Sequence, residues 1–112
     1  MNSTLKHFIA STTIAGLIAA GSLFAASASE NFENHCAKCH GADGKGQTKV
    51  GKKLNVRDMT TAAYKKEFDD AKAIKSLKEG IKKDGKEIKR SFASDLSEAE
   101  LKELIGYVKA LK

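Results

Sequence analysis

The sequence contains few residues of the kinds that build metal clusters and disulfide networks. Its 112 residues include only two cysteines, Cys36 and Cys39, and three histidines. A structural zinc site usually takes four ligands as two separated pairs, and no second cysteine or histidine pair follows the first. His35 is a direct neighbour of Cys36 and is poorly placed to complete a tetrahedron. A single disulfide would suit an exported protein, but it would leave the adjacent His40 without a role.

The sequence also lacks any strand-like run, internal repeat, low-complexity segment or domain linker. Without a βαβ framework, the two cysteines do not have the setting of a thioredoxin-like redox pair. The formal net charge is +6, yet no nucleic-acid-binding motif is present. The glycines between residues 41 and 51 do not form a phosphate-binding loop, because no strand precedes them. These absences point to one small all-α domain.

One five-residue motif carries most of the functional information. Cys36-Ala37-Lys38-Cys39-His40 has the C-x-x-C-H pattern of haem c attachment. The two thiols of this pattern add across the two vinyl groups of one haem, because their spacing presents both sulfurs to the same edge. The histidine that follows then lies under the iron, where its imidazole can be the proximal ligand. The sequence therefore predicts covalent haem at Cys36 and Cys39, with His40 bound to the iron.

Residues 1–28 have the pattern of a secretory signal peptide. Lys6 is followed by an uncharged, largely apolar stretch from Phe8 to Ala28, and Ala26-Ser27-Ala28 matches the A-x-A cleavage pattern. The alternative is an uncleaved membrane anchor, although five Ser/Thr and two Gly make the stretch a weak transmembrane helix. We expect cleavage near Ala28 and export to the periplasm, the side on which bacteria attach haem covalently. The mature domain is then residues 29–112.

The expected mature chain is basic. Removing residues 1–28 takes away only Lys6 among the charged residues, so 19 basic and 14 acidic residues remain, a formal charge of +5. Two groups of positive residues are expected near the haem edge: Lys45, Lys49, Lys52 and Lys53, then Lys82, Lys83, Lys86, Lys89 and Arg90. Such a field could steer acidic redox partners, or it could be a solvated surface that only keeps the protein soluble.

The apolar periodicity predicts short helices separated by loops. A first helix over residues 29–37 would have Ser29 near its N-cap, and a weaker one covers residues 60–68. A third begins at Asp69 or Asp70 and ends at Gly80. Ser97 and Glu100 form a capping box for a last helix that runs to the end of the chain. Residues 41–51, with four glycines, and residues 81–95 are expected to be loops.

From these motifs, residues 29–112 resemble a small class I cytochrome c of the bacterial monohaem type. Phe32, four residues before Cys36, matches the aromatic residue of that family's first helix. Gly106-Tyr107 resembles the positions of the last helix that pack against it, where a small residue lets the helices approach closely. The segment 40–46 is similar to the loop that follows the motif in many members. The resemblance implies three to five short helices wrapped around one haem c.

The chain departs from the family at the sixth iron ligand. The resemblance implies a methionine in the loop before the last helix, but residues 84–93 contain neither methionine nor proline. Counting back from Phe92 and Ser97 places Lys89 at the position of that methionine. Met59, nineteen residues after His40, is early for a distal ligand and is expected to be a core residue. Three alternatives follow, namely Lys89 as a neutral amine, Met59, or an open site.

The resemblance implies a carrier of single electrons and not an enzyme. We expect a monomer whose redox protein partners are acidic or membrane-bound oxidoreductases. An alternative is a haem-based ligand binder or sensor with an open or lysine-gated distal site. A weak peroxidase-like enzyme would need a distal base. His35 cannot easily provide one, because it lies on the proximal segment that carries the covalent attachment.

Overall fold

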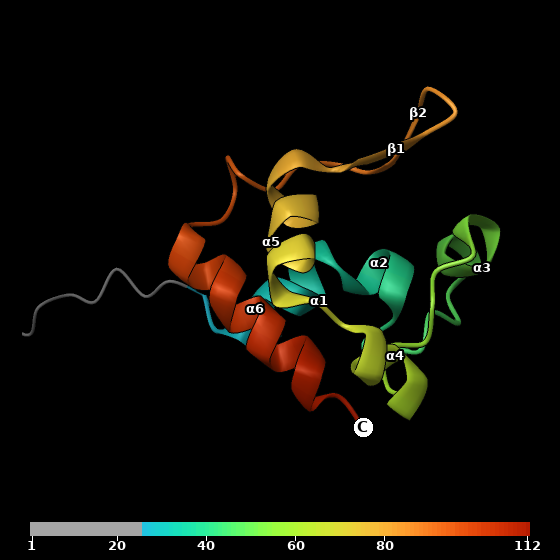
Figure 1. The fold of residues 1–112 in the computed structure, drawn as a ribbon, viewed down its shortest axis with the longest axis horizontal. Helices are drawn as coiled ribbons and strands as arrows, with labels where there is room; N and C mark the ends of the chain where they lie inside the picture. Colours follow the sequence, from blue (N-terminus) through green and yellow to red (C-terminus); the bar gives the residue numbers. More distant parts are fainter. Residues whose placement is uncertain (1–25) are drawn as a thin grey trace, which may run out of the picture.

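Residues 26–112 are described by the computed structural model, so the expected signal segment lies outside them except for its last three residues. Figure 1 shows the arrangement of the elements. They are α1 (Ala28–His35), α2 (Ala37–His40), α3 (Lys49–Leu54), α4 (Ala62–Glu67), α5 (Asp70–Glu79), β1 (Ile81–Lys83), β2 (Lys86–Lys89) and α6 (Glu98–Ala110). The largely helical fold is as predicted, although the described residues form six helices rather than three to five. None of these helices has the length and apolar character needed to cross a membrane.

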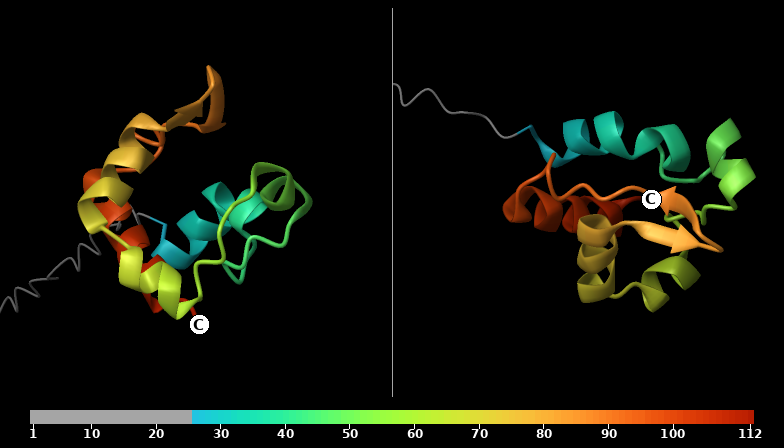
Figure 2. Two further views of the ribbon diagram at one scale, coloured as in Figure 1. Left: turned by 45° about the vertical axis from the view of Figure 1, so that its right-hand side comes forward. Right: turned by 90° about the horizontal axis from the view of Figure 1, so that it is seen from above.

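The first and last helices form the centre of the fold. In the views of Figures 1 and 2, α6 lies against α1, and α5 packs on α6 beside it. Phe32 of α1 is 2% exposed, and Leu101 and Leu104 of α6 are buried just as deeply. The Phe32 ring lies 5.0 Å from the ring of Tyr107, so the expected aromatic contact between the two helices is confirmed. The core also contains Met59, from the segment between α3 and α4, and Phe92 and Leu96, from the segment after the hairpin.

Hydrogen bonds at the ends of α1 and α6 join the two helices. Ser97 and Glu100 form the predicted capping box of α6. A second capping box at α1 uses Ser27 and Glu30, so the N-cap lies two residues before Ser29, which was expected near it. The buried side chain of Asn31 donates to Glu100 at 2.9 Å and to the carbonyl of Ala26 at 3.2 Å. The Glu100 carboxylate therefore caps its own helix and holds α1 against it.

The glycine-rich segment after the motif contains a helix that the sequence analysis missed. Residues 49–54 form α3, although Gly51 was expected to interrupt regular structure. The Thr48 hydroxyl explains its position, because it accepts from the Gly51 amide at 2.9 Å and donates to the Cys39 carbonyl at 2.8 Å. A Cβ on Gly51 would lie 2.2 Å from that same carbonyl oxygen. Gly51 is thus a close-packing position between α3 and α2 rather than a helix breaker.

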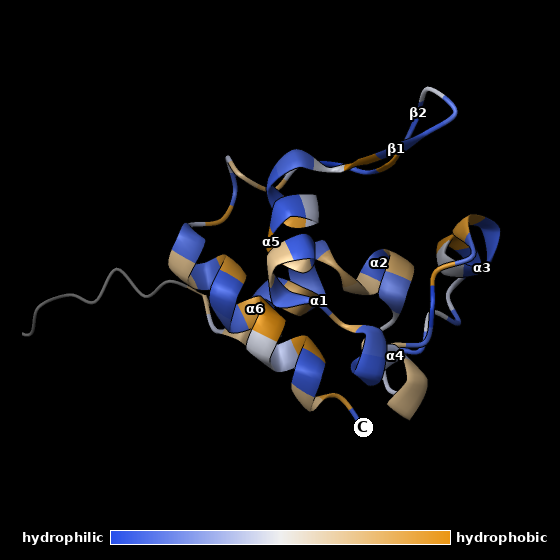
Figure 3. Cartoon of the chain, in the orientation of Figure 1, coloured by the Kyte–Doolittle hydropathy of each residue, from blue (hydrophilic) through white to orange (hydrophobic). Residues whose placement is uncertain are grey.

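Residues 81–95 are not simply the charged loop that was predicted. The helix α5 begins after Asp69 and ends at Gly80 as expected, and β1 and β2 then form an antiparallel hairpin. Its two-residue turn is Asp84-Gly85, with φ of 51° and 76°. Asp-Gly is a strong hairpin signal because both residues tolerate positive φ. Figure 3 shows the hairpin as hydrophilic over most of its length, with a hydrophobic segment in β1.

Gly106 does not lie at a close helix contact. A Cβ added there would meet no atom within 4 Å, and the residue is exposed on α6. The expectation that this glycine lets α1 and α6 approach was therefore wrong. The helices meet instead through the buried side chains of Phe32, Leu101 and Leu104.

Candidate functional site

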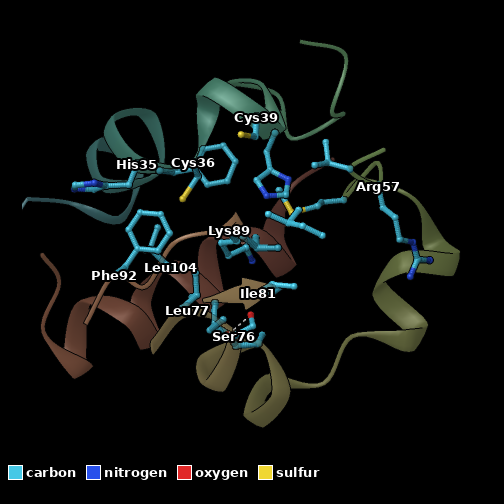
Figure 4. A pocket seen from close by; sticks show the side chains of 18 of the residues that line it. His35, Cys36, Cys39, Arg57, Ser76, Leu77, Ile81, Lys89, Phe92 and Leu104 are labelled. Atoms are coloured by element: carbon cyan, nitrogen blue, oxygen red, sulfur yellow. Dashed lines mark hydrogen bonds between the residues drawn. The ribbon is translucent and has the colours of Figure 1, made fainter. Parts of the chain in front are cut away.

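A cavity of about 800 Å³ lies between the α1–α2 segment and the layer formed by α5 and the hairpin. Its size is that of an ordinary cofactor site. Figure 4 shows Cys36 and Cys39 on one side of this cavity, and Leu77, Ile81 and Lys89 on the other. Segments far apart in the sequence therefore meet around one space.

The C-x-x-C-H motif forms one turn of helix on the wall of this cavity. Cys36 ends α1 and precedes α2, and its carbonyl accepts from the Cys39 amide at 3.2 Å and from the His40 amide at 2.9 Å. Residues three and four apart lie on the same face of a helix. All three side chains are partly buried and line the cavity.

His40 has the properties of an imidazole that can bind a metal ion. Its Nδ1 atom is buried and has no hydrogen-bond partner among the residues that the structure describes. Burial, with a smaller effect from the positive charge of Lys89, lowers the pKa of His40 to about 4. The ring is therefore neutral near pH 7, which is the form that binds metal ions.

The two cysteines do not have the properties of a redox-active pair. Burial raises the pKa of Cys36 to about 11, whereas reactive cysteines usually have a lowered pKa because the thiolate is the nucleophile. Both cysteines are free, and they are not joined to each other. Within residues 26–112 no group of three or more His, Cys, Asp or Glu side chains is placed to hold a metal ion.

These residues fit a covalently attached haem. Two thiols and a neutral imidazole with an unpartnered nitrogen face the same cavity from a single turn of helix. Apolar side chains form part of the opposite and lateral walls, among them Leu77 of α5, Ile88 of β2, and Leu104 and Val108 of α6. Such a lining suits a large apolar ring whose polar centre is held by one motif.

The two candidate distal ligands have different environments. Lys89 is partly buried in the cavity, and burial lowers the pKa of its amine, with an opposing effect from Cys36 and Cys39. Met59 also lines the cavity but is only 4% exposed, and its amide donates to the Gly44 carbonyl at 2.9 Å. Met59 is therefore a core residue, as expected, and is tied to the loop that follows His40.

Several cavity residues were not predicted from the sequence. Ile81 and Ile88 come from the hairpin, which was expected to be a loop. Arg57 and Tyr64 stand on another wall, where the guanidinium lies 5.1 Å from the centre of the Tyr64 ring. Arg57 also pairs with Glu67 at 2.7 Å. The Asp84-Gly85 turn could have revealed the hairpin, but nothing in the local sequence pairs Arg57 with Tyr64.

The second predicted group of positive residues reaches this cavity, whereas no lysine of the first group lines it. Lys89 and Arg90 line it directly, as do residues 54–57 at the end of α3. The remaining lysines are exposed: Lys45, Lys49, Lys52, Lys53, Lys82, Lys83 and Lys86. Of the four ion pairs found within residues 26–112, none uses these seven lysines, whereas Arg90 pairs with Asp95 at 2.5 Å.

Comparison with known proteins gives a consistent result. A family model described as Cytochrome c matches residues 25–112. A solved structure of the KustC0563 c-type cytochrome aligns with a TM-score of 0.66 and 27% identity, covering 78% of this chain and 99% of that one. A mutant form of Kustc0563 aligns with a TM-score of 0.67 and 29% identity, covering 78% of this chain and all of that one. No curated protein matches the chain.

Proposed function

The chain belongs to the cytochrome c family, whose members carry haem c and serve as electron carriers rather than enzymes, and we propose which residues hold the haem and where the protein works. We propose that Cys36 and Cys39 bind the haem through thioether bonds and that His40 is the proximal iron ligand. When bound, the haem supplies an iron centre that accepts and releases one electron. The protein would carry single electrons in the periplasm between redox proteins.

One observation carries this assignment. A single helical turn directs two partly buried thiols and an unpartnered, neutral imidazole into one cavity. In that arrangement the two cysteines would hold the edge of the haem ring, and the neutral imidazole of His40 would bind the iron. The apolar side chains of Leu77, Leu104 and Val108 would contact the haem ring and limit its exposure to water.

The attachment can be tested by mass spectrometry of the denatured holoprotein. We expect a mass equal to the chain plus one haem, and no haem released into acidified organic solvent. Cys36→Ala and Cys39→Ala should each lose one thioether bond or fail to mature. Ser76→Ala, which changes another polar residue of the cavity wall, is the control and should retain both bonds. Haem that extracts freely from the wild-type protein would contradict the assignment.

We also propose that the redox partners are acidic and dock near the cavity. The seven exposed lysines of the α3 region and the hairpin have no ion-pair partner among the described residues, so their charge remains available. Electron transfer to an acidic partner should slow as salt rises, because the Debye length falls from about 10 Å at 0.1 M to about 3 Å at 1 M. Lys86→Glu should slow the reaction at low salt, whereas Lys102→Glu on α6 should change it little. A rate independent of salt would contradict steering.

Export is the remaining part of the proposal. Cleavage after Ala28 would leave residues 29–112 as the mature domain and would remove the Ser27 side chain that caps α1. Mass spectrometry of the protein recovered from the periplasm of an expressing bacterium should give a mature chain that begins at Ser29. A chain that keeps residues 1–28 and remains with the membrane fraction would support the uncleaved anchor instead.

A further inference from the structure

We propose that the β1–β2 hairpin delivers the second axial ligand of the iron, namely the side-chain amine of Lys89. The proposal rests on the haem attachment proposed above, with His40 as the first axial ligand. The hairpin places Lys89 in the cavity wall that faces the α1–α2 segment, as Figure 4 shows. Four features of the structure support it: the hairpin register, its anchoring, the surroundings of the amine, and the position of Met59.

The hairpin contains an irregularity that turns Lys89 into the cavity. Lys83 pairs with Lys86 and Lys82 pairs with Glu87, but Ile81 pairs with Lys89, so β2 has one extra residue at Ile88. In a regular hairpin residue 88 would stand opposite Ile81, and residue 89 would point to the other face. A bulge sets two residues of one strand opposite one residue of its partner and re-aims their side chains. Ile81, Ile88 and Lys89 accordingly all line the cavity.

The base of the hairpin is held firmly in place at this bulge. A Cβ on Gly80 would lie 2.6 Å from the Lys89 carbonyl oxygen and 3.0 Å from the Ser91 amide, so these segments are in close contact. The Phe92 amide donates to the Leu77 carbonyl at 2.8 Å, and the Ser91 hydroxyl donates to the Lys78 carbonyl. The backbone of Lys89 is therefore fixed against the end of α5, and only its side chain extends into the cavity.

The Lys89 amine lacks the surroundings that normally stabilise a charged lysine. It is partly buried, and the structure gives it no hydrogen bond or ion pair within residues 26–112. It faces the α1–α2 segment, from which Cys36 and His40 line the same cavity. An unpaired buried ammonium is costly, whereas a neutral amine has a lone pair that a metal can accept. The neighbouring Lys82, Lys83 and Lys86 are exposed and do not line the cavity.

Met59, the alternative ligand, is a core residue. Its side chain is 4% exposed and packs in the core with Phe32, Phe92 and Leu104. Its amide is bonded to Gly44, in the loop that follows His40, so its backbone belongs to the His40 side of the cavity. To bind the iron opposite His40, the Met59 side chain would have to leave the core and cross the cavity.

The ligand can be identified in the ferric holoprotein without any substitution. Protein labelled with ¹⁵N only at lysine should show a directly coupled ¹⁵N nucleus in pulsed electron paramagnetic resonance, and its optical spectrum should be low-spin without a thioether-to-iron band. Lys89→Ala should give a high-spin or water-bound spectrum and should bind added imidazole at least about tenfold more tightly, since 1.4 kcal/mol corresponds to tenfold. Lys86→Ala, an exposed lysine of the same strand, is the matched control and should behave as wild type.

Each other result overturns the proposal. A thioether band in wild type would identify Met59, and a high-spin wild type would show an open site and favour a ligand-binding function. Failure of Lys89→Ala to alter the spectrum, or the absence of a coupled lysine nitrogen, would exclude Lys89. If Lys89→Ala is unstable, the labelled wild-type protein still decides the question. Mass spectrometry of covalent haem is independent of all these outcomes, so loss of the proposed attachment at Cys36 and Cys39 would be recognised separately.

Discussion

The rings of Phe32 and Tyr107 meet at a centroid distance of 5.0 Å and an interplanar angle of 43°. Phe32 lies on α1, four residues before the first cysteine of the motif, and Tyr107 lies in the last turns of α6. The contact therefore joins the two ends of the domain directly behind the haem-binding turn. Phe32 is 2% exposed, whereas Tyr107 is only partly buried. The two residues should accordingly contribute unequally to stability.

We expect Phe32→Ala to lower the free energy of unfolding of the holoprotein by about 3–5 kcal/mol, because a fully buried ring leaves a cavity. Tyr107→Ala should cost less, since part of its ring already contacts solvent. Chemical denaturation followed by circular dichroism measures both changes. A midpoint for Phe32→Ala within error of wild type would show that the terminal helices do not depend on this contact.

The sequence was sufficient to predict α5, α6 and the haem-binding turn, because the sequence patterns that specify them are local. The helix α5 has a capping aspartate and a terminal glycine, α6 has a capping box, and both have regular apolar spacing. The C-x-x-C-H motif requires only one turn of helix to bring its three side chains together. Gly106 was misjudged because its role was assigned by resemblance, whereas the space around a glycine depends on the whole packing arrangement.

The open surroundings of Gly106 give a second prediction. A glycine inside an exposed helix surface is less favourable than alanine by about 0.8–1.0 kcal/mol, because it loses more backbone entropy on folding. Since a Cβ at this position meets nothing within 4 Å, Gly106→Ala should raise the free energy of unfolding by up to about 1 kcal/mol. Gly51→Ala is the contrasting variant and should be destabilising, because its Cβ would collide with the Cys39 carbonyl. A destabilised Gly106→Ala would mean that α6 has a closer neighbour there.

Glu100 should make the stability dependent on pH. The hydrogen bond from the Asn31 side chain, followed by that from the Ser97 backbone, lowers the pKa of Glu100 in the folded protein. A lowered folded-state pKa means that the contribution is complete above the unfolded value of about 4.3 and is lost as the pH falls through the folded value. Glu100→Gln should therefore be less stable than wild type at pH 7, and the difference should shrink below about pH 4.

Denaturation curves at a series of pH values measure this effect. Glu103→Gln changes an exposed residue of the same helix and is the matched control. The comparison uses differences from wild type at each pH, so protonation of His40, which affects all variants equally, cancels. A difference between Glu100→Gln and wild type that is constant from pH 7 to 3 would show that the carboxylate charge does not support the contact with Asn31.

The distal half of the site was less predictable because its geometry is not local. Counting along the chain placed Lys89 near the iron, but a loop of residues 81–95 would not explain why this lysine enters the cavity. The explanation requires the strand pairing, the extra residue at Ile88 and the contact with Gly80. The two strands, of three and four residues, consist mostly of charged residues and therefore lack the alternating apolar pattern by which strands are recognised.

Gly80 and Gly85 provide a test of how firmly the hairpin is held. Both have a φ of 76°, so a side chain at either position carries backbone strain. Gly80 also has a ψ of −178°. A Cβ on Gly80 would lie only 2.6 Å from the Lys89 carbonyl oxygen, whereas a Cβ on Gly85 would meet nothing within 4 Å. We expect Gly85→Ala to cost about 1–2 kcal/mol, from the left-handed conformation alone. Gly80→Ala should cost about 2–4 kcal/mol, because it combines a glycine-only conformation with an overpacked contact.

The same pair separates the anchoring of Lys89 from general stability. If the contact at Gly80 positions Lys89, then Gly80→Ala should loosen the ferric haem site and bind added imidazole more tightly than Gly85→Ala does. The measurement is made in conditions where both variants remain folded by circular dichroism, so that unfolding does not mimic ligand loss. Equal imidazole affinity in the two variants, together with a greater loss of stability in Gly80→Ala, would show that Gly80 supports the hairpin without placing Lys89. Tighter imidazole binding in Gly80→Ala alone would connect the packing at the end of α5 to the coordination of the iron.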